Sequence, residues 1–133
     1  MKNNELFQKA QSARYLALEL AHNANESHSG GAMSMADVLI TLYANYLNNT
    51  PQTQNEVNRD RFILSKGHCC SLYYAILAEM GFFTKQELLD NFAKNGTHFF
   101  AHASHTLPGV ELSTGSLGHG LPVSCGLALG SKR

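Results

Sequence analysis

Apolar residues in the first part of the chain recur every three or four positions, the period of a helix with one buried face. This spacing predicts an amphipathic helix at Asn4–Asn23 and a second at Ser34–Leu47, separated by a turn at Asn25–Gly31. Ser34, followed by Asp37 three residues later, resembles a capping box and predicts the start of the second helix. Polar residues and a proline then end that helix, so a polar loop is expected next.

The middle of the chain holds one short apolar run with the character of a strand. Arg61–Ser65 is apolar at its centre and bounded by charged residues and glycine, which predicts a buried parallel strand. His68 follows its carboxyl end, the edge at which open α/β sheets usually bind ligands. Helical spacing predicts further helices at Cys69–Met80, Thr84–Lys94 and Leu121–Gly130. Gly81 is placed to end the first of these helices, and Thr84 with Glu87 forms a capping box at the start of the second.

Length and charge narrow the class of protein. The 133 residues have the size of one domain, but a single strand does not make a sheet. We therefore interpret residues 1–133 as the opening portion of an α/β domain, mostly helical, whose parallel sheet is incomplete in this chain. Ten basic and ten acidic residues balance, and no basic stripe indicates a nucleic-acid or membrane partner. With no signal segment and no apolar run long enough to span a bilayer, we expect a cytoplasmic protein.

A glycine-rich loop at Pro108–Leu121 is a candidate for ligand contact. Gly115, Gly118 and Gly120 let the backbone turn and approach a ligand closely, and neighbouring Ser and Thr residues offer hydroxyl groups. The loop leads into an expected helix, whose first N–H groups would suit an anion. A plain turn before a packed helix explains the same pattern, so the residues alone leave both interpretations open.

Histidines gather where the chain is almost free of charge. Between Asn95 and Ser131 the one formally charged residue is Glu111, which predicts a segment that is buried or lines a cleft. His28, His68 and His102 lie in expected loops or junctions. We expect these three imidazoles to converge at one edge of the sheet.

Other site chemistries fit the residues less well. The spacing of His98, His102 and His105 lacks the further ligands of a known zinc motif, so we assign no metal ligand to this chain. Cys69 and Cys70 are adjacent and have no base at a productive spacing, and three cysteines in all fit reduced thiols. The glycine-rich loop also differs from the serine-hydrolase elbow and from the standard nucleotide loops.

Three blocks of sequence, in order and in separation, resemble the amino-terminal part of transketolase. They are Ser27–Gly31 with Met35–Leu39, then Arg59–His68, and then Pro108–Glu111 with Ser113–Gly118. The Leu-Ser-Lys-Gly-His motif at 64–68 resembles that of the split type of transketolase, in which the amino- and carboxyl-terminal halves are separate chains.

The resemblance implies thiamine diphosphate chemistry, in which a two-carbon ketol unit passes from a ketose to an aldose, with sugar phosphates or related sugars as substrates. By matching positions, His68 would lie at the cofactor diphosphate, and Gly115, Ser116 and Leu117 would approach the cofactor's rings. His28 and His102 would be the catalytic residues, in contact with the donor sugar's hydroxyls and assisting proton transfer.

The resemblance also implies what this chain leaves to other segments. The ligands of Mg²⁺ (or Ca²⁺) and the glutamate that activates the cofactor are expected outside residues 1–133, so the chain would form a partial diphosphate-binding domain. A carboxyl-terminal half or subunit is the expected partner, in a homo- or hetero-oligomer, and the isolated chain is expected to be inactive. A truncated, non-catalytic interaction module and a sister enzyme such as deoxyxylulose phosphate synthase remain the alternatives.

Overall fold

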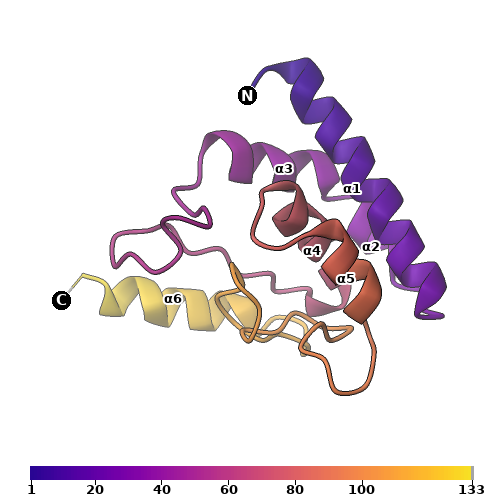
Figure 1. The fold of residues 1–133 in the computed structure, drawn as a ribbon. Helices are drawn as coiled ribbons and strands as arrows, with labels where there is room; N and C mark the ends of the chain where they lie inside the picture. The colour runs from indigo at the N-terminus through magenta and orange to yellow at the C-terminus, as the bar shows by residue number, and fades with distance from the viewer. Residues whose placement is uncertain (133) are drawn as a thin grey trace.

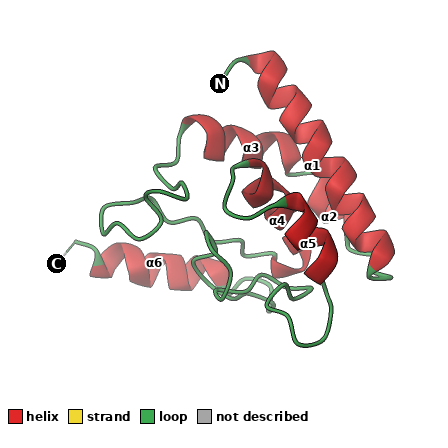
Figure 2. Ribbon diagram, in the orientation of Figure 1, coloured by secondary structure: helices red, strands yellow, loops and turns green. Residues whose placement is uncertain are grey.

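The computed structural model describes residues 1–132, and it consists of helices joined by long loops (Figure 1, Figure 2). The helices are α1 (Asn3–Asn23), α2 (Ser29–Met33), α3 (Ala36–Asn45), the 3₁₀ turn η1 (Gly67–Cys69), α4 (Cys70–Glu79), α5 (Lys85–Asn91) and α6 (Gly120–Gly130). The helices predicted from apolar spacing are therefore present, with boundaries that differ by a few residues.

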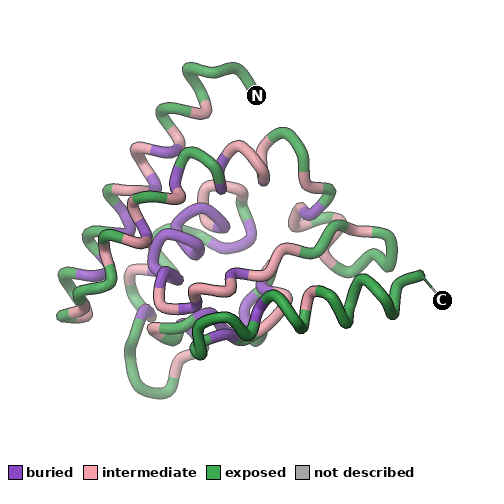
Figure 3. The backbone as a smooth tube through the Cα atoms, turned by 180° about the vertical axis from the view of Figure 1, so that it is seen from behind, coloured by how far each residue is buried: buried purple, intermediate pink, exposed green. Residues whose placement is uncertain are grey.

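Helix α4 forms the centre of the molecule. Its residues 70–77 are all buried, and α1, α2, α3 and α5 pack against it (Figure 3). Aromatic rings fill the space beside it: the ring of Phe62 lies 5.7 Å from that of Tyr43 and 5.3 Å from that of Tyr73, centroid to centroid. The two tyrosine hydroxyls are 3.0 Å apart and hydrogen-bond each other, which satisfies polar groups that burial would otherwise leave unpaired.

Two of the predicted helix signals are present and one is not. Thr84 caps α5, because its Oγ1 accepts a hydrogen bond of 3.0 Å from the Glu87 N–H. Gly81 follows α4 with a φ of +86°, a conformation that glycine adopts without strain. The predicted cap at Ser34 is wrong: its hydroxyl donates to the Gly31 carbonyl at 2.9 Å, since the expected turn before it is in part the short helix α2.

No strand is formed at Arg61–Ser65, and none is present elsewhere in residues 1–132. The predicted strand is therefore not confirmed within this chain. The reason is that a strand exists only through backbone pairing with a neighbour, and in the described chain no backbone–backbone hydrogen bond joins residues 61–65 to another segment. The coarser expectation, a largely helical part of a domain, agrees with the structure.

Helix α6 stands apart from the other helices (Figure 1). Almost all of its residues are exposed, including Leu121 at 70% and Leu129 at 67% (Figure 3). A helix without charged residues and without a covering layer leaves apolar surface in contact with water. Within residues 1–132 no helix combines the length and the apolar character that crossing a membrane would need.

Candidate functional site

Three histidines from distant parts of the sequence lie together. The ring of His28, just before α2, is 5.2 Å from that of His68 in η1 and 6.3 Å from that of His102, measured between centroids. His102 belongs to the loop between α5 and α6. The fold thus gathers the three imidazoles that the sequence singled out, although at the junction of loops and helices rather than at the edge of a formed sheet.

Helix α4 fixes the position of the His102 backbone. The hydroxyl of Tyr74 on α4 donates to the His102 carbonyl at 2.8 Å and accepts from the N–H of Ser104 at 3.0 Å. The intervening Ala103 donates its N–H to the carbonyl of Gly67 at 3.1 Å. Because Gly67 directly precedes His68, these bonds hold the two histidine-bearing segments side by side.

The glycine-rich loop is attached to the same place through Thr114. Its N–H donates to the Ala103 carbonyl at 3.1 Å, and its Oγ1 donates to the Leu64 carbonyl at 2.5 Å. Gly67 lies so close that a Cβ added there would be 2.1 Å from the Thr114 carbonyl oxygen. Only a residue without a side chain permits this approach, so Gly67 allows the loop to reach the histidines.

The remaining predicted residues are only in part beside the histidines. A Cβ on Gly115 would be 3.6 Å from Cδ2 of His102, so this glycine lies next to that ring. Ser116 and Leu117 are exposed, Leu117 at 72%, and face away from packed structure. The structure therefore brings together His28, His68, His102 and Gly115, and leaves the next two residues on an open surface.

Two charged residues that the sequence reasoning did not assign also belong to this cluster. The Lys66 ammonium donates to the Gly31 carbonyl at 2.7 Å, and the half-buried Glu26, two residues before His28, is within range of the charges of His28 and His102. Burial raises the pKa of Glu26, and the charges of His28 and His102 act against that shift. Their positions next to His28 and His68 in the sequence were the available signal.

The environment of His68 favours its neutral form. Burial lowers its pKa, and the nearby charges of His28, His102 and Lys66 lower it further. A neutral imidazole has one N–H donor and one acceptor nitrogen, so His68 can donate a hydrogen bond to an anionic ligand without carrying a full charge.

Metal and thiol chemistry have little support in the described residues. In residues 1–132 no three His, Cys, Asp or Glu side chains are arranged to hold a metal ion. The His105 ring is instead hydrogen-bonded to the Ser113 hydroxyl, with 2.7 Å from Nδ1 to Oγ. Cys69 and Cys70 are buried, and burial raises the pKa of both thiols, which disfavours the reactive thiolate.

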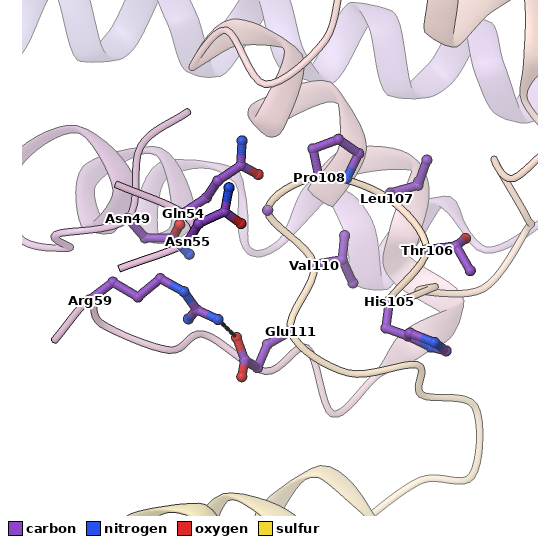
Figure 4. A pocket seen from close by; sticks show the side chains of 11 residues that line it. Asn49, Gln54, Asn55, Arg59, His105, Thr106, Leu107, Pro108, Val110 and Glu111 are labelled. Atoms are coloured by element: carbon purple, nitrogen blue, oxygen red, sulfur yellow. Dashed lines mark ion pairs between the residues drawn. The ribbon is translucent and has the colours of Figure 1, made fainter. Parts of the chain in front are cut away.

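A separate polar cavity of about 370 Å³ lies on another side of the glycine-rich loop (Figure 4). Its wall includes Asn49, His105 and the ion pair between Arg59 and Glu111, which are 2.6 Å apart. The charge of Glu111, the one acidic residue of the histidine-rich stretch, is therefore used in an ion pair away from the three imidazoles. His28, His68 and His102 do not line this cavity.

Comparison with known proteins identifies the relatives of the chain. A family described as "Transketolase, thiamine diphosphate binding domain" matches residues 7–133. The chain is 40% identical over 134 residues to an apulose-4-phosphate transketolase subunit from Actinobacillus succinogenes, and 37% identical over 115 residues to the subunit of the same name from Phocaeicola vulgatus. These alignments cover 98% and 86% of this chain and 48% and 41% of the relatives.

The fold comparison agrees. The crystal structure of transketolase from Campylobacter jejuni is similar with a TM-score of 0.87 and 32% sequence identity, over 96% of this chain and 20% of that one. The chain thus spans less than half the length of the two subunit relatives and a fifth of this transketolase.

Proposed function

We propose, from the premise that this chain belongs to the transketolase family and matches its thiamine diphosphate-binding domain, that it takes part in transferring a two-carbon ketol unit between sugars. It would do so together with segments outside residues 1–133. The substrates would be sugar phosphates, the class that the names of its two subunit relatives state.

The observation that carries the proposal is the meeting of His28, His68 and His102 beside Gly115. Three imidazoles next to a residue without a side chain suit a ligand with an anionic end and a flat ring system, because the rings donate hydrogen bonds and the glycine leaves space. Thiamine diphosphate is such a ligand, and when bound it supplies the electron sink for breaking a carbon–carbon bond. The residues present therefore fit the cofactor of the family.

The chain's own side chains would bind and orient. His68 would donate a hydrogen bond to the diphosphate, which its neutral form allows. The backbone of Gly115, Ser116 and Leu117 would approach the cofactor's rings. His28 and His102 would hold the hydroxyls of the donor sugar and move protons to and from them, as imidazoles do near neutral pH. The metal ion would be held by ligands outside this chain.

The proposal also explains why one face of the fold, formed by residues 57–63 and α6, is exposed. A groove of about 770 Å³ lies between residues 57–63 and α6. We expect an apolar strand from a part of the domain outside this chain to enter it, to pair with Arg61–Ser65 as the first step of a parallel sheet, and to cover α6. A carboxyl-terminal half or subunit would then complete the enzyme, in a homo- or hetero-oligomer.

Assembly of the chain with its completing segments tests the function. Ketol transfer should appear in the assembly and be absent from the 133-residue chain alone, and calorimetry with thiamine diphosphate and Mg²⁺ should detect tight binding only in the assembly. His68→Ala should weaken cofactor binding at least about tenfold, the loss expected for a hydrogen bond to a charged group. His98→Ala, at an exposed histidine in the loop between α5 and α6, is the control.

Two results would contradict the proposal. Unchanged cofactor binding by His68→Ala would remove the diphosphate assignment. An assembly that folds and binds partners without ketol transfer would favour the second candidate, a non-catalytic interaction module. The exposed apolar surface of α6 is the observation that supports this candidate.

A further inference from the structure

The polar cavity beside the glycine-rich loop is a second place where this fold can receive a small molecule (Figure 4). One of its walls is formed by residues 105–111 and the other by the segment 49–59. Its volume of about 370 Å³ lies in the range of small-molecule sites. Both walls belong to this chain, so they form without the further segments that the histidine site needs.

The loop wall has a fixed position against the core. The Tyr73 hydroxyl donates to the Gly109 carbonyl at 3.0 Å, and the Val110 N–H donates to the Leu107 carbonyl at 3.2 Å. Gly109 has a φ of +81°, and a Cβ added there would be 2.8 Å from the ring of Phe82. Glycine is therefore required at this turn, and the loop cannot move inward to close the cavity.

The facing wall is held by hydrogen bonds of its own. The Asn48 N–H donates to the Asp60 carboxylate at 2.7 Å, and the Asp60 N–H donates to the Asn48 carbonyl at 3.1 Å. After Asn49, the Gln54 N–H donates to the Thr50 carbonyl at 2.8 Å. Because bonds within the chain hold both walls, the cavity is preformed, and a ligand would bind with little cost of ordering.

The carboxamide of Asn49 lies in the wall without a partner. The residue is 3% exposed, and within residues 1–132 its Oδ1 has no hydrogen bond. Buried polar atoms are normally paired, so an unpaired one beside a cavity points to a partner that enters from outside the chain. The last torsion of an asparagine side chain is broad, so the carboxamide can turn either its oxygen or its nitrogen toward the cavity.

The other polar groups of the wall suit a ligand without charge. Arg59 and Arg61 each lie 2.6 Å from an oxygen of the Glu111 carboxylate, so neither that carboxylate nor the guanidinium of Arg59 is left without a counter-charge. The carboxamides of Gln54 and Asn55 lie beside Asn49 and face the loop (Figure 4). A carboxamide both donates and accepts hydrogen bonds, as does the hydroxyl group of a sugar or polyol.

We propose that this cavity binds a small neutral polyhydroxylated molecule, a free monosaccharide or sugar alcohol, whose hydroxyls exchange hydrogen bonds with Asn49, Gln54 and Asn55. A phosphorylated sugar is disfavoured, because its phosphate would lose water without gaining an unpaired cation. The cavity shares none of its lining with His28, His68 and His102, so the inference goes beyond the proposed ketol transfer and does not depend on it.

Ribitol and ribitol 5-phosphate are a matched neutral and anionic pair for the test. Neither has the carbonyl group that ketol transfer needs. Each is titrated into the 133-residue chain, and the side-chain amide signals of Asn49, Gln54 and Asn55 are followed by NMR. Ribitol should shift these signals saturably with a Kd of about 1 mM, as expected for a small polar ligand. Ribitol 5-phosphate should bind at least about fivefold more weakly, because of the desolvation of its charge.

Three variants assign the binding to the carboxamides. Asn49→Ala should weaken ribitol binding about fivefold, the loss of one or two neutral hydrogen bonds. Asn55→Ala, at an exposed position of the wall, should weaken it about threefold and serves if the buried substitution disturbs the fold, which circular dichroism reports. Asn58→Ala, exposed and outside the cavity, is the matched control and should bind ribitol as the unmodified chain does.

The assembled enzyme provides the second measurement. Arg59 borders both this cavity and the groove beside α6 that the completing strand is expected to enter. Calorimetry with ribitol should therefore give the same affinity in the assembly as in the chain, and the same loss in Asn49→Ala, because the cavity stays open when the groove is filled.

Four outcomes would overturn the proposal. They are the absence of a saturable shift, equal affinities for ribitol and its phosphate, an unchanged affinity in the folded asparagine variants of the wall, and binding that is lost on assembly. The last would mean that another segment of the enzyme fills the cavity. None of these measurements uses ketol transfer, so a failed transfer assay would count against the proposed function alone.

Discussion

The central helix α4 and the last helix α6 differ in how far their apolar side chains are buried. Around α4 the apolar residues are enclosed on all sides, and Leu77 has no exposed surface. On α6 the residues are just as apolar, yet Leu129 is 67% exposed. Apolar composition alone therefore does not make a core: other helices enclose the side chains of α4, whereas those of α6 lie on an open surface.

Equal truncations in the two regions should have very different effects. Leu77→Ala should lower the free energy of unfolding by about 3 kcal/mol, because it removes buried methyl groups and leaves a cavity. Leu129→Ala should change it by less than about 0.5 kcal/mol in the same chain, because that side chain is already in water. Urea denaturation followed by circular dichroism measures both. Similar losses would mean that α6 is packed in solution.

Substitutions at two glycines also compare a packed region with the exposed helix α6. Gly67→Ala should cost about 2 kcal/mol, because the added methyl group would overlap the Thr114 carbonyl and push the glycine-rich loop away. Gly126→Ala in α6 meets open space and should stabilise the chain by about 0.5 kcal/mol or more through helix propensity. Thermal unfolding of the two variants gives the comparison, and a neutral Gly67→Ala would show that the loop is not held against η1.

A smaller effect concerns the charges of the packed region. Glu79 on α4 lies in ion pairs with Lys9 of α1 and with Lys85 of α5. Burial acts to raise its pKa, but hydrogen bonds from Lys85 and Ser12 and the charges of both lysines outweigh it, so the pKa is lowered. A pKa lower in the folded than in the unfolded state stabilises the fold above the unfolded value, about 4.3 for glutamate, and this is lost on acidification.

Glu79→Gln should therefore lower the free energy of unfolding by about 1 kcal/mol at pH 7, a modest amount because both lysines are partly exposed. The loss should shrink as the pH falls below about 4.3, which urea titrations between about pH 3 and pH 7 would reveal. Glu87→Gln, exposed on α5, is the control. A loss that is independent of pH would assign the effect to packing instead of charge.

Local features of the sequence predicted much of this fold. The helices at Asn4–Asn23 and Cys69–Met80 follow from apolar spacing, and the cap at Thr84 follows from residues three apart, because such signals depend only on near neighbours. The strand at Arg61–Ser65 could not be decided in this way, since pairing depends on a distant segment. The cap at Ser34 failed because its hydroxyl found another partner, the Gly31 carbonyl.

In the candidate site too, some residues could be predicted from local sequence signals and others could not. His28, His68 and His102 could be selected because each lies at a junction, and the structure places the rings of His68 and His102 within 6.3 Å of that of His28. The contributions of Glu26 and Lys66 were not predicted, because they depend on the direction in which a turn points a side chain. That direction is fixed by backbone conformation and by bonds across the fold, neither of which a spacing pattern contains.

The close approach at Gly67 has a consequence for reading natural variation. Because no side chain fits between this residue and the Thr114 carbonyl, selection for a folded protein would keep glycine there even in a descendant that had lost every catalytic ability. Conservation of glycine at position 67 would then show that the fold was retained, while substitutions at His28 and His102 would show that the catalytic activity was lost. A comparison of substitution rates at these positions would date the two events separately.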